Sequence, residues 1–349
     1  MKRIGKMISI LLAGSVLLTA CAQNNEKYNN YSYGLNENGV YETFDVSKVT
    51  VPELDYFKAT DDEILTWTIK EKDTEDSDVF KSVDSYLYTY GQELLATLGV
   101  ADKEVAEDKD IVSATMTFKY NDKVLENYGS KSSYKADKNG DAITKSFIGH
   151  KAKDEYDVKY TFPEDDPDYA GKEADVHIVI DSIIMADPLT DEVIKNNLDK
   201  INEILPDVVD KDSFLKAIKP KLAETIYPEY IAYKLQNVDV AYEDTYVDAE
   251  MYRLKFRLAQ MGYSYNKYLE DTKMTDEEVK AYCAMVAKEN MICMKIADEQ
   301  NIKITEDDVK EYHGENFEYL QESQGLPYLK LNLMRDKAIA YIIEQLNTQ

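Results

Sequence analysis

Cysteine and histidine, the residue types that most often bind metals or act as nucleophiles, are few in this chain and far apart. A metal or redox site would need several of them close together, as in CxxC or HExxH, and neither pattern occurs. The sequence therefore predicts no metal and no cofactor. The residues concerned are Cys21, Cys283, Cys293, His150, His177 and His313.

Cys283 and Cys293 fall within a stretch of helical periodicity. Ten residues on one straight helix separate two positions by about 15 Å, which is beyond the reach of a disulfide. We therefore expect both thiols to be free and buried as small hydrophobic groups.

Cys21 has a different setting, because it ends an N-terminal export pattern. Basic residues at positions 2–6 precede an apolar core at 7–18, which is too short for an ordinary membrane span, and the tetrapeptide LTAC closes the pattern at Cys21. LTAC resembles a bacterial lipobox, which implies cleavage before Cys21 and acylation of that residue. The alternative is a plain secretory signal peptide with an incidental cysteine. We expect residues 1–21 to be a lipoprotein signal peptide and the mature protein to be anchored on the extracytoplasmic face of the cell membrane.

Residues 22–47 are polar and show no period, so they are expected to form a flexible tether. Further on, Tyr156, Val158, Tyr160 and Phe162 alternate with polar residues, the pattern of a half-buried strand. A Pro- and Gly-containing turn and a second alternating run at 174–183 follow, so the two strands should pair antiparallel.

A third alternating strand is predicted at 111–120, with a turn at Asn121-Asp122. Residues 129–141 are rich in Gly, Ser, Lys and Asp and are expected to form a surface loop. The three strands together predict a small antiparallel sheet.

The order of motifs around this sheet resembles a known family. GHKAKDEYDVKYTFPED, then GKEADVHIVIDSI, then LTDE resembles the end of the FKBP-type prolyl-isomerase domain of trigger factor and its exit into the helical chaperone domain. The resemblance implies a linker strand and helices at 48–104, an FKBP-like domain at 105–185 and a helical chaperone domain at 186–349, without a ribosome-binding domain. The expected fold class is α+β, a small antiparallel sheet domain inserted in or attached to an all-α chaperone domain.

FKBP-type domains catalyse isomerisation in a pocket of aromatic rings with an Asp nearby. In this chain the family's aromatic and acidic positions fall largely on aliphatic residues or Thr, while one Phe is kept and a Tyr lies near a lost aromatic. We therefore expect a degenerate pocket with weak activity or none, although an active isomerase remains the alternative. The pocket-equivalent positions are Thr115, Met116, Leu125, Ile143, Phe162, Tyr169 and Val176.

The C-terminal half has helical periodicity throughout, punctuated by Pro206, Pro220 and Pro228. N-cap motifs start helices at Thr190, Thr275 and Thr305. Tyr is abundant, at 28 residues, and combines apolar area with a polar end suited to varied polypeptides. The positions first considered for client binding are Tyr242, Tyr246, Tyr252, Tyr263, Tyr265 and Tyr268.

A net charge of −26 makes nucleic acid a poor partner, because phosphate would be repelled. The partners that the resemblance and the export pattern imply are unfolded or exported polypeptides and the membrane, through Cys21, with no ribosome. Three functions remain open at this stage: a membrane-anchored folding factor, an active prolyl isomerase and a solute-binding lipoprotein. The last would need two lobes with parallel sheets, which the helical C-terminal half argues against.

Overall fold

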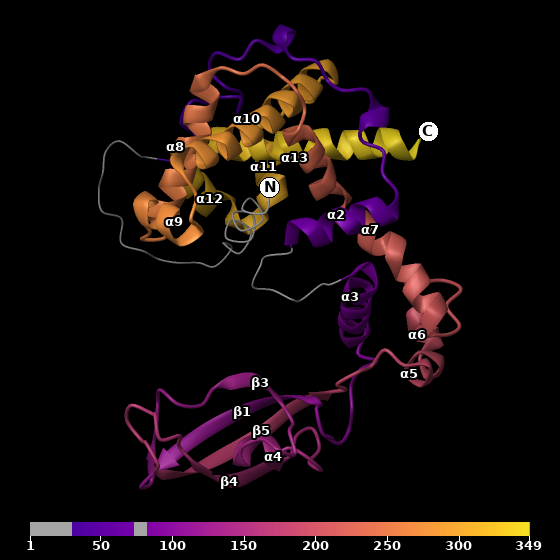
Figure 1. The fold of residues 1–349 in the computed structure, drawn as a ribbon, viewed down its shortest axis with the longest axis vertical. Coiled ribbons are helices and arrows are strands. Elements are labelled where there is room, and N and C mark those ends of the chain that lie inside the picture. The colour runs from indigo at the N-terminus through magenta and orange to yellow at the C-terminus, as the bar shows by residue number, and fades with distance from the viewer. Residues whose placement is uncertain (1–29, 73–81, 349) are drawn as a thin grey trace. The chain divides into compact units, whose positions relative to one another are not determined.

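The computed structural model describes residues 30–72 and 82–348. Contacts divide the chain into two compact units. We call residues 84–222 the sheet unit and the remainder, 1–83 and 223–349, the helical unit. The described residues combine many helices with one small antiparallel sheet, so the fold class is α+β as expected (Figure 1).

The sheet has the order β2-β1-β5-β4, with β3 also paired to β1, and every pairing is antiparallel. The three strands predicted from alternation are present as β1, β4 and β5. The strands are β1 (Ile111–Tyr120), β2 (Lys123–Val124), β3 (Lys131–Lys135), β4 (Glu155–Thr161) and β5 (Glu173–Ile184).

One face of this sheet is a packed core. Along β1, Val112, Ala114, Met116 and Phe118 are buried and alternate with partly exposed residues, and β5 shows the same alternation. The short helix α4 (Ala142–Ser146) contacts β4 and contributes the buried Ile143.

The prediction of a surface loop over 129–141 is wrong in part, because β3 lies within it. Four of the five β3 side chains are exposed, so this strand lacks the apolar alternation that would have revealed it. Its backbone pairing with β1 holds it in place.

The sheet unit also contains α3 (Val83–Thr97), α5 (Asp191–Asn196), α6 (Leu198–Asn202) and the first part of α7 (Lys211–Gln236). The domain boundaries expected at 104/105 and 185/186 fall within this unit and stay predictions. Gly91 explains the grouping: a Cβ there would approach the side chains of Phe214, Ile218 and Leu189 to 3.1–3.4 Å, so its absence lets α3 pack closely against them.

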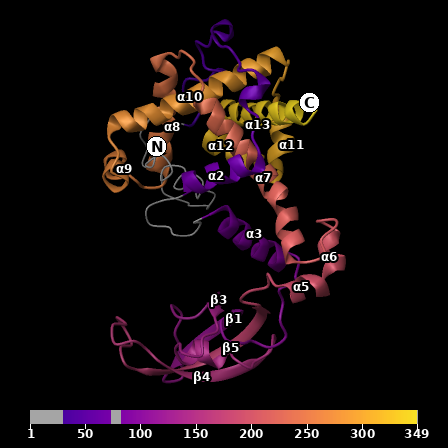
Figure 2. The same ribbon diagram turned by 45° about the vertical axis from the view of Figure 1, so that its right-hand side comes forward.

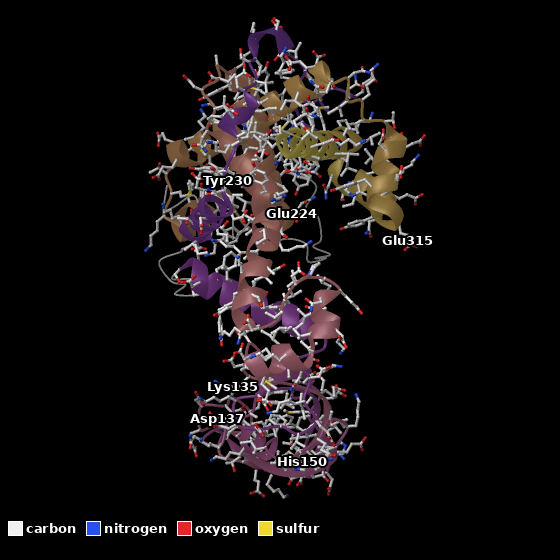
Figure 3. The ribbon with its side chains drawn as sticks, turned by 90° about the vertical axis from the view of Figure 1, so that its right-hand side faces the viewer. Lys135, Asp137, His150, Glu224, Tyr230 and Glu315 are labelled. Carbon is white, nitrogen blue, oxygen red and sulfur yellow. The ribbon has the colours of Figure 1, made fainter. Side chains whose placement is uncertain are left out.

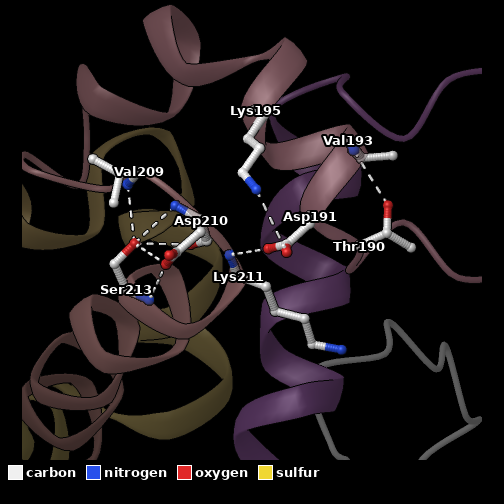
Figure 4. Close-up of polar contacts among 8 residues, drawn as sticks. All are labelled: Thr190, Asp191, Val193, Lys195, Val209, Asp210, Lys211 and Ser213. Carbon is white, nitrogen blue, oxygen red and sulfur yellow. Dashed lines mark hydrogen bonds and ion pairs between the residues drawn. The ribbon is translucent and has the colours of Figure 1, made fainter.

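Local polar contacts fix the start of α5 and α7 (Figure 4). The Thr190 hydroxyl accepts a hydrogen bond from the Val193 amide at 3.2 Å, as its N-cap motif predicts. In the first turn of α7, the Ser213 amide donates a hydrogen bond to the carboxylate of Asp210, the residue before the helix, at 2.8 Å. The Asp191 carboxylate accepts from the Lys211 amide at 2.9 Å, which ties the beginning of α5 to that of α7.

The prolines divide the C-terminal half only in part: Pro206 lies in the break between α6 and α7, but α7 continues through both Pro220 and Pro228. Buried apolar side chains occur along it at helical spacing, among them Phe214, Ile218 and Ile231. Packing of these side chains offsets the hydrogen bonds that the prolines cannot make.

In the helical unit, α10 packs against α8 and α13, and all three are seen together in both ribbon views (Figures 1 and 2). They share one large apolar core with the end of α7 and with η2. The elements of this unit besides α7 are η1 (Val46–Lys48), η2 (Leu54–Tyr56), α2 (Asp61–Lys72), α8 (Asp244–Gln260), α9 (Tyr265–Thr272), α10 (Asp276–Glu299), α11 (Glu306–His313), η3 (Gly314–Asn316), α12 (Phe317–Gln324) and α13 (Leu326–Asn347).

The prediction of a flexible tether over 22–47 is wrong from Asn30 onward. Tyr31, Leu35 and Tyr41 are buried, and the latter two belong to the core of the helical unit. The polar composition of the segment concealed these three anchors. Residues 1–29, including the expected signal peptide and Cys21, lie outside the described part of the chain.

A buried polar network anchors this segment to α8 and α10. Glu250 accepts hydrogen bonds from the Tyr41 hydroxyl at 2.5 Å and from the Asn290 amide at 2.9 Å, and it pairs with Arg253. Arg253 also donates to the backbone oxygens of Tyr31 at 2.8 Å and Tyr33 at 2.9 Å. Glu250 and Arg253 thus compensate each other's buried charge, and their hydrogen bonds to Tyr31, Tyr33 and Tyr41 fix the path of the N-terminal segment.

Candidate functional site

The expected isomerase positions lie in the interior of the sheet unit. Five of them are at most 8% exposed and belong to one apolar cluster, and the partly buried Tyr169 packs against it. Thr115 points away from that cluster, on the other face of β1, and its hydroxyl donates to Asp181 at 3.1 Å. The five are Met116, Leu125, Ile143, Phe162 and Val176.

Sequence reasoning named Phe162 and Tyr169 but missed the rings that join them in an aromatic group at one end of this core. Phe162 is joined by Tyr128, with ring centroids 5.1 Å apart, and by Tyr169 at 5.4 Å. Phe118 and Tyr160 complete the group, edge to face at 5.7 Å. The sequence did carry a signal for this group: each of the two alternating strands, 111–120 and 156–162, has two aromatic residues near its end.

A carboxylate lies beside these rings. Asp166 accepts a hydrogen bond from the Tyr128 hydroxyl at 3.1 Å and from the Tyr169 amide at 2.8 Å. Desolvation and then the contact with Asp166 raise the pKa of Tyr128 to about 12. Desolvation opposes ionisation of Asp166, but the amides of Tyr169 and Asp168 outweigh it and lower the pKa of this carboxyl group. At neutral pH the pair is therefore a phenol donating to a carboxylate.

The helical unit carries a different kind of site, a surface hollow of about 530 Å³. The N-terminal segment forms one side and α8 the other. Two of the tyrosines named for client binding, Tyr246 and Tyr252, line it. The described residues that line it are Asn30, Ser32, Tyr33, Gly34, Glu42, Thr43, Thr245, Tyr246, Asp248 and Tyr252.

Aromatic stacking builds the walls of this hollow. The ring of Tyr33, which is 54% exposed, stacks on Tyr252 with centroids 4.4 Å apart. Tyr246 is only 4% exposed, against its expected role in client binding. It stacks on the buried Tyr41 at 4.6 Å, and its hydroxyl donates to the backbone oxygen of Thr43 at 3.0 Å. Since both stacks join the N-terminal segment to α8, the hollow exists only where that segment is folded.

A smaller hollow of about 140 Å³ adjoins the first, since Asp248 lines both. Tyr242, another of the proposed client-binding residues, lines this second hollow and is 42% exposed. Lys288 lies over its ring, with 5.6 Å between the ammonium nitrogen and the centroid.

The remaining three tyrosines are not in these hollows. Tyr268 is 1% exposed and belongs to the core between α8, α9 and α10. Tyr263 and Tyr265 pack against that core and use their hydroxyl groups within the protein, donating to Asp271 and, at 2.9 Å, to Asp276. The structure thus brings Tyr246 and Tyr252 together, with Tyr242 alongside, and separates the other three.

Sequence reasoning also missed Tyr33, Glu42 and Asp248. Tyr33 and Glu42 fall in the segment interpreted as a tether, and a single Asp on a helix gives no distinctive signal. Cys283 and Cys293 are free and buried, as predicted, and burial raises the pKa of both thiols, that of Cys283 to about 12.

Across residues 30–72 and 82–348, no group of three or more His, Cys, Asp or Glu side chains is arranged to hold a metal ion. Within the same residues, no helix combines the length and apolar character needed to cross a bilayer.

No protein-family model matches this chain. It is similar to bacterial trigger factors. The one from Finegoldia magna is 25% identical over 332 residues, covering 85% of this chain and 72% of the relative. Those from Halothermothrix orenii and Desulforapulum autotrophicum are each 25% identical and cover 72% and 55% of this chain. This chain spans 65% and 47% of those two relatives.

Among solved structures, one described as "Promiscuous Substrate Recognition in Folding and Assembly Activities of the Trigger Factor Chaperone" covers 86% of this chain and 71% of that chain. Its sequence identity to this chain is 15% and its TM-score is 0.40. The fold class given above therefore rests on the helices and strands of the chain itself.

Proposed function

Because the chain is similar to trigger factors along most of its length, we propose that it is a protein-folding factor that binds unfolded polypeptides. The observation that carries the proposal is the match to the Finegoldia magna trigger factor. At 85% of this chain, the match is too long to be confined to either unit. The hollow beside α8, with the exposed ring of Tyr33 stacked on Tyr252, supplies adaptable apolar surface of the kind that such binding requires.

This folding factor acts outside the cytoplasm, anchored by acyl groups on Cys21. The basic and apolar N-terminal pattern and the LTAC motif support this part of the proposal. Cys21 lies nine residues before Asn30, where the described chain begins, and nine residues span at most about 30 Å whatever their conformation. The anchor would therefore hold the helical unit near the membrane surface.

Prolyl isomerisation is the second candidate, because aromatic rings and a carboxylate occur together at Tyr128, Phe162, Tyr169 and Asp166. We nevertheless propose weak isomerisation or none. A prolyl ring must enter an open pocket, whereas five of the family's pocket positions are filled by core packing and at most 8% exposed, and Phe162 is the one aromatic ring among them. The five are Met116, Leu125, Ile143, Phe162 and Val176.

Two assays on the chain from Ala22 onward, which keeps every described residue, test this proposal. The first follows aggregation of a chemically denatured protein after dilution, and the chain should slow it at equimolar concentration. The second follows cis–trans isomerisation of a Xaa-Pro peptide, which should remain near its uncatalysed rate, with a time constant of about 10–100 s.

Unchanged aggregation would overturn the folding-factor proposal. Isomerisation as fast as that of an ordinary FKBP domain would establish the second candidate, provided that Tyr128→Phe slows it. That variant keeps the ring and removes only the hydroxyl group that donates to Asp166.

A further inference from the structure

The hollow beside α8 is acidic as well as aromatic. Glu42 and Asp248 both line it and are exposed, and neither side chain has a hydrogen-bond or ion-pair partner among the described residues. None of the described residues that line it is basic. A bound group could therefore meet two carboxylates without first displacing a cation of the residues that the structure describes.

The aromatic wall favours the same ligand class. The stacked pair Tyr33 and Tyr252 lines the same hollow as these carboxylates, and a guanidinium or ammonium group over a ring is attracted to its negative face. A planar guanidinium can also donate two hydrogen bonds to one carboxylate. Carboxylate and ring together select a positive charge, whereas a purely apolar segment would leave the carboxylates beside apolar surface.

We infer that this hollow binds an arginine or lysine side chain of a client polypeptide, an assignment that rests on the proposed function. Its volume of about 530 Å³ exceeds that of one side chain, and the adjoining hollow at Asp248 leaves room for neighbouring residues of an extended chain. Hydroxyl groups of Ser32, Thr43 and Thr245 at the lining can hydrogen-bond that chain's backbone. The net charge of −26 attracts basic segments from a distance.

The test uses two fluorescent peptides of about twelve unstructured residues that differ only in charge. One carries two arginines and the other carries citrulline, the uncharged analogue of arginine, at the same positions. Fluorescence anisotropy with the chain from Ala22 onward should give a lower Kd for the arginine peptide. The double variant Glu42→Gln/Asp248→Asn should raise that Kd about tenfold and leave the Kd of the citrulline peptide unchanged.

A second double variant, Asp298→Asn/Glu315→Gln, is the matched control. Both residues are exposed in the helical unit and lie outside the two hollows, and Glu315 is labelled in Figure 3. This variant removes the same two charges and should change the Kd of the arginine peptide less than twofold. Tyr33→Leu should raise it about threefold, because the substitution removes the ring face but keeps an apolar side chain.

Equal binding of the arginine and citrulline peptides would overturn the inference, and so would no binding of either. If the two double variants weakened binding of the arginine peptide equally, the inference would also be overturned, because binding would then depend only on the overall charge of the protein. The aggregation assay separates this inference from the proposed function. Slowed aggregation with any of these three outcomes leaves the folding factor standing and removes only the hollow as its cationic subsite.

Discussion

At the scale of single residues, the helical unit buries ionic groups that a sequence pattern places at the surface. Glu250 and Arg253 are 8% and 5% exposed, respectively, although nothing in the sequence distinguishes them from other charged residues of α8. Their partners come from elsewhere in the chain, namely Tyr41, Asn290 and the backbone of Tyr31. The candidate site likewise depends on contacts between distant segments. The sequence singled out Tyr246 and Tyr252 on α8 but not Tyr33 and Glu42, which line the other side of the hollow.

Replacing Arg253 by Ala should destabilise the helical unit by about 3–5 kcal/mol, because the variant leaves the Glu250 carboxylate buried without its ionic partner. Urea unfolding followed by far-ultraviolet circular dichroism measures the loss. Lys303→Ala, at an exposed position of the same unit, is the control and should change stability by less than about 0.5 kcal/mol. Similar unfolding midpoints for the two variants would show that the buried pair does not anchor the N-terminal segment.

At the scale of elements, local signals predicted much of the fold. Alternation identified β1, β4 and β5, and Thr275 and Thr305 each cap a helix in a complete capping box. The predictions from sequence were wrong where contacts between distant segments override the local composition. The polar strand β3 depends on its pairing with β1, and α7 continues past two prolines because its apolar side chains are buried.

The capping box of α11 should contribute stability that depends on pH. Hydrogen bonds from the Thr305 hydroxyl and amide, with Lys337 nearby, lower the pKa of Asp308 to about 2. The unfolded chain has a pKa near ~3.9 at this residue. Because the folded pKa is the lower one, the contribution is complete above about pH 4 and is lost as the pH falls to about 2.

Asp308→Asn should therefore lower the urea midpoint at pH 7, and its difference from the unmodified chain should shrink towards pH 2. Asp307→Asn, one residue earlier and exposed, removes the same charge without touching the box and controls for general charge effects. If the effect of Asp308→Asn is the same at pH 7 and pH 2, the carboxylate does not act through its ionised form.

At the scale of the whole molecule, the resemblance to trigger factor indicated which kinds of units to expect but not which segments complete them. Tyr41 and Glu250 are separated by 209 residues, and no local pattern announces such a contact. Likewise, α3 groups with the sheet unit because Gly91 admits Phe214 and Ile218. Pairings over such distances depend on how side chains fit together in three dimensions, which periodicity and propensity do not contain.

Replacing Cys21 by Ala should prevent acylation and release the protein from the membrane, or leave its precursor uncleaved. Fractionation of cells producing the unmodified and variant chains measures this, with Cys283→Ala as a control that should remain in the membrane fraction. A Cys21→Ala chain that is cleaved and retained like the unmodified one would exclude the lipoprotein assignment.

The most direct test of the central claim compares one polypeptide in two states. A disulfide-bonded protein is offered to the chain from Ala22 onward either native or after reduction and carboxamidomethylation, which keeps it unfolded without denaturant. Isothermal titration should detect binding of the unfolded form at micromolar Kd and none of the native form. Equal binding of both forms, or no binding of the unfolded one, would contradict the account of this chain as a folding factor.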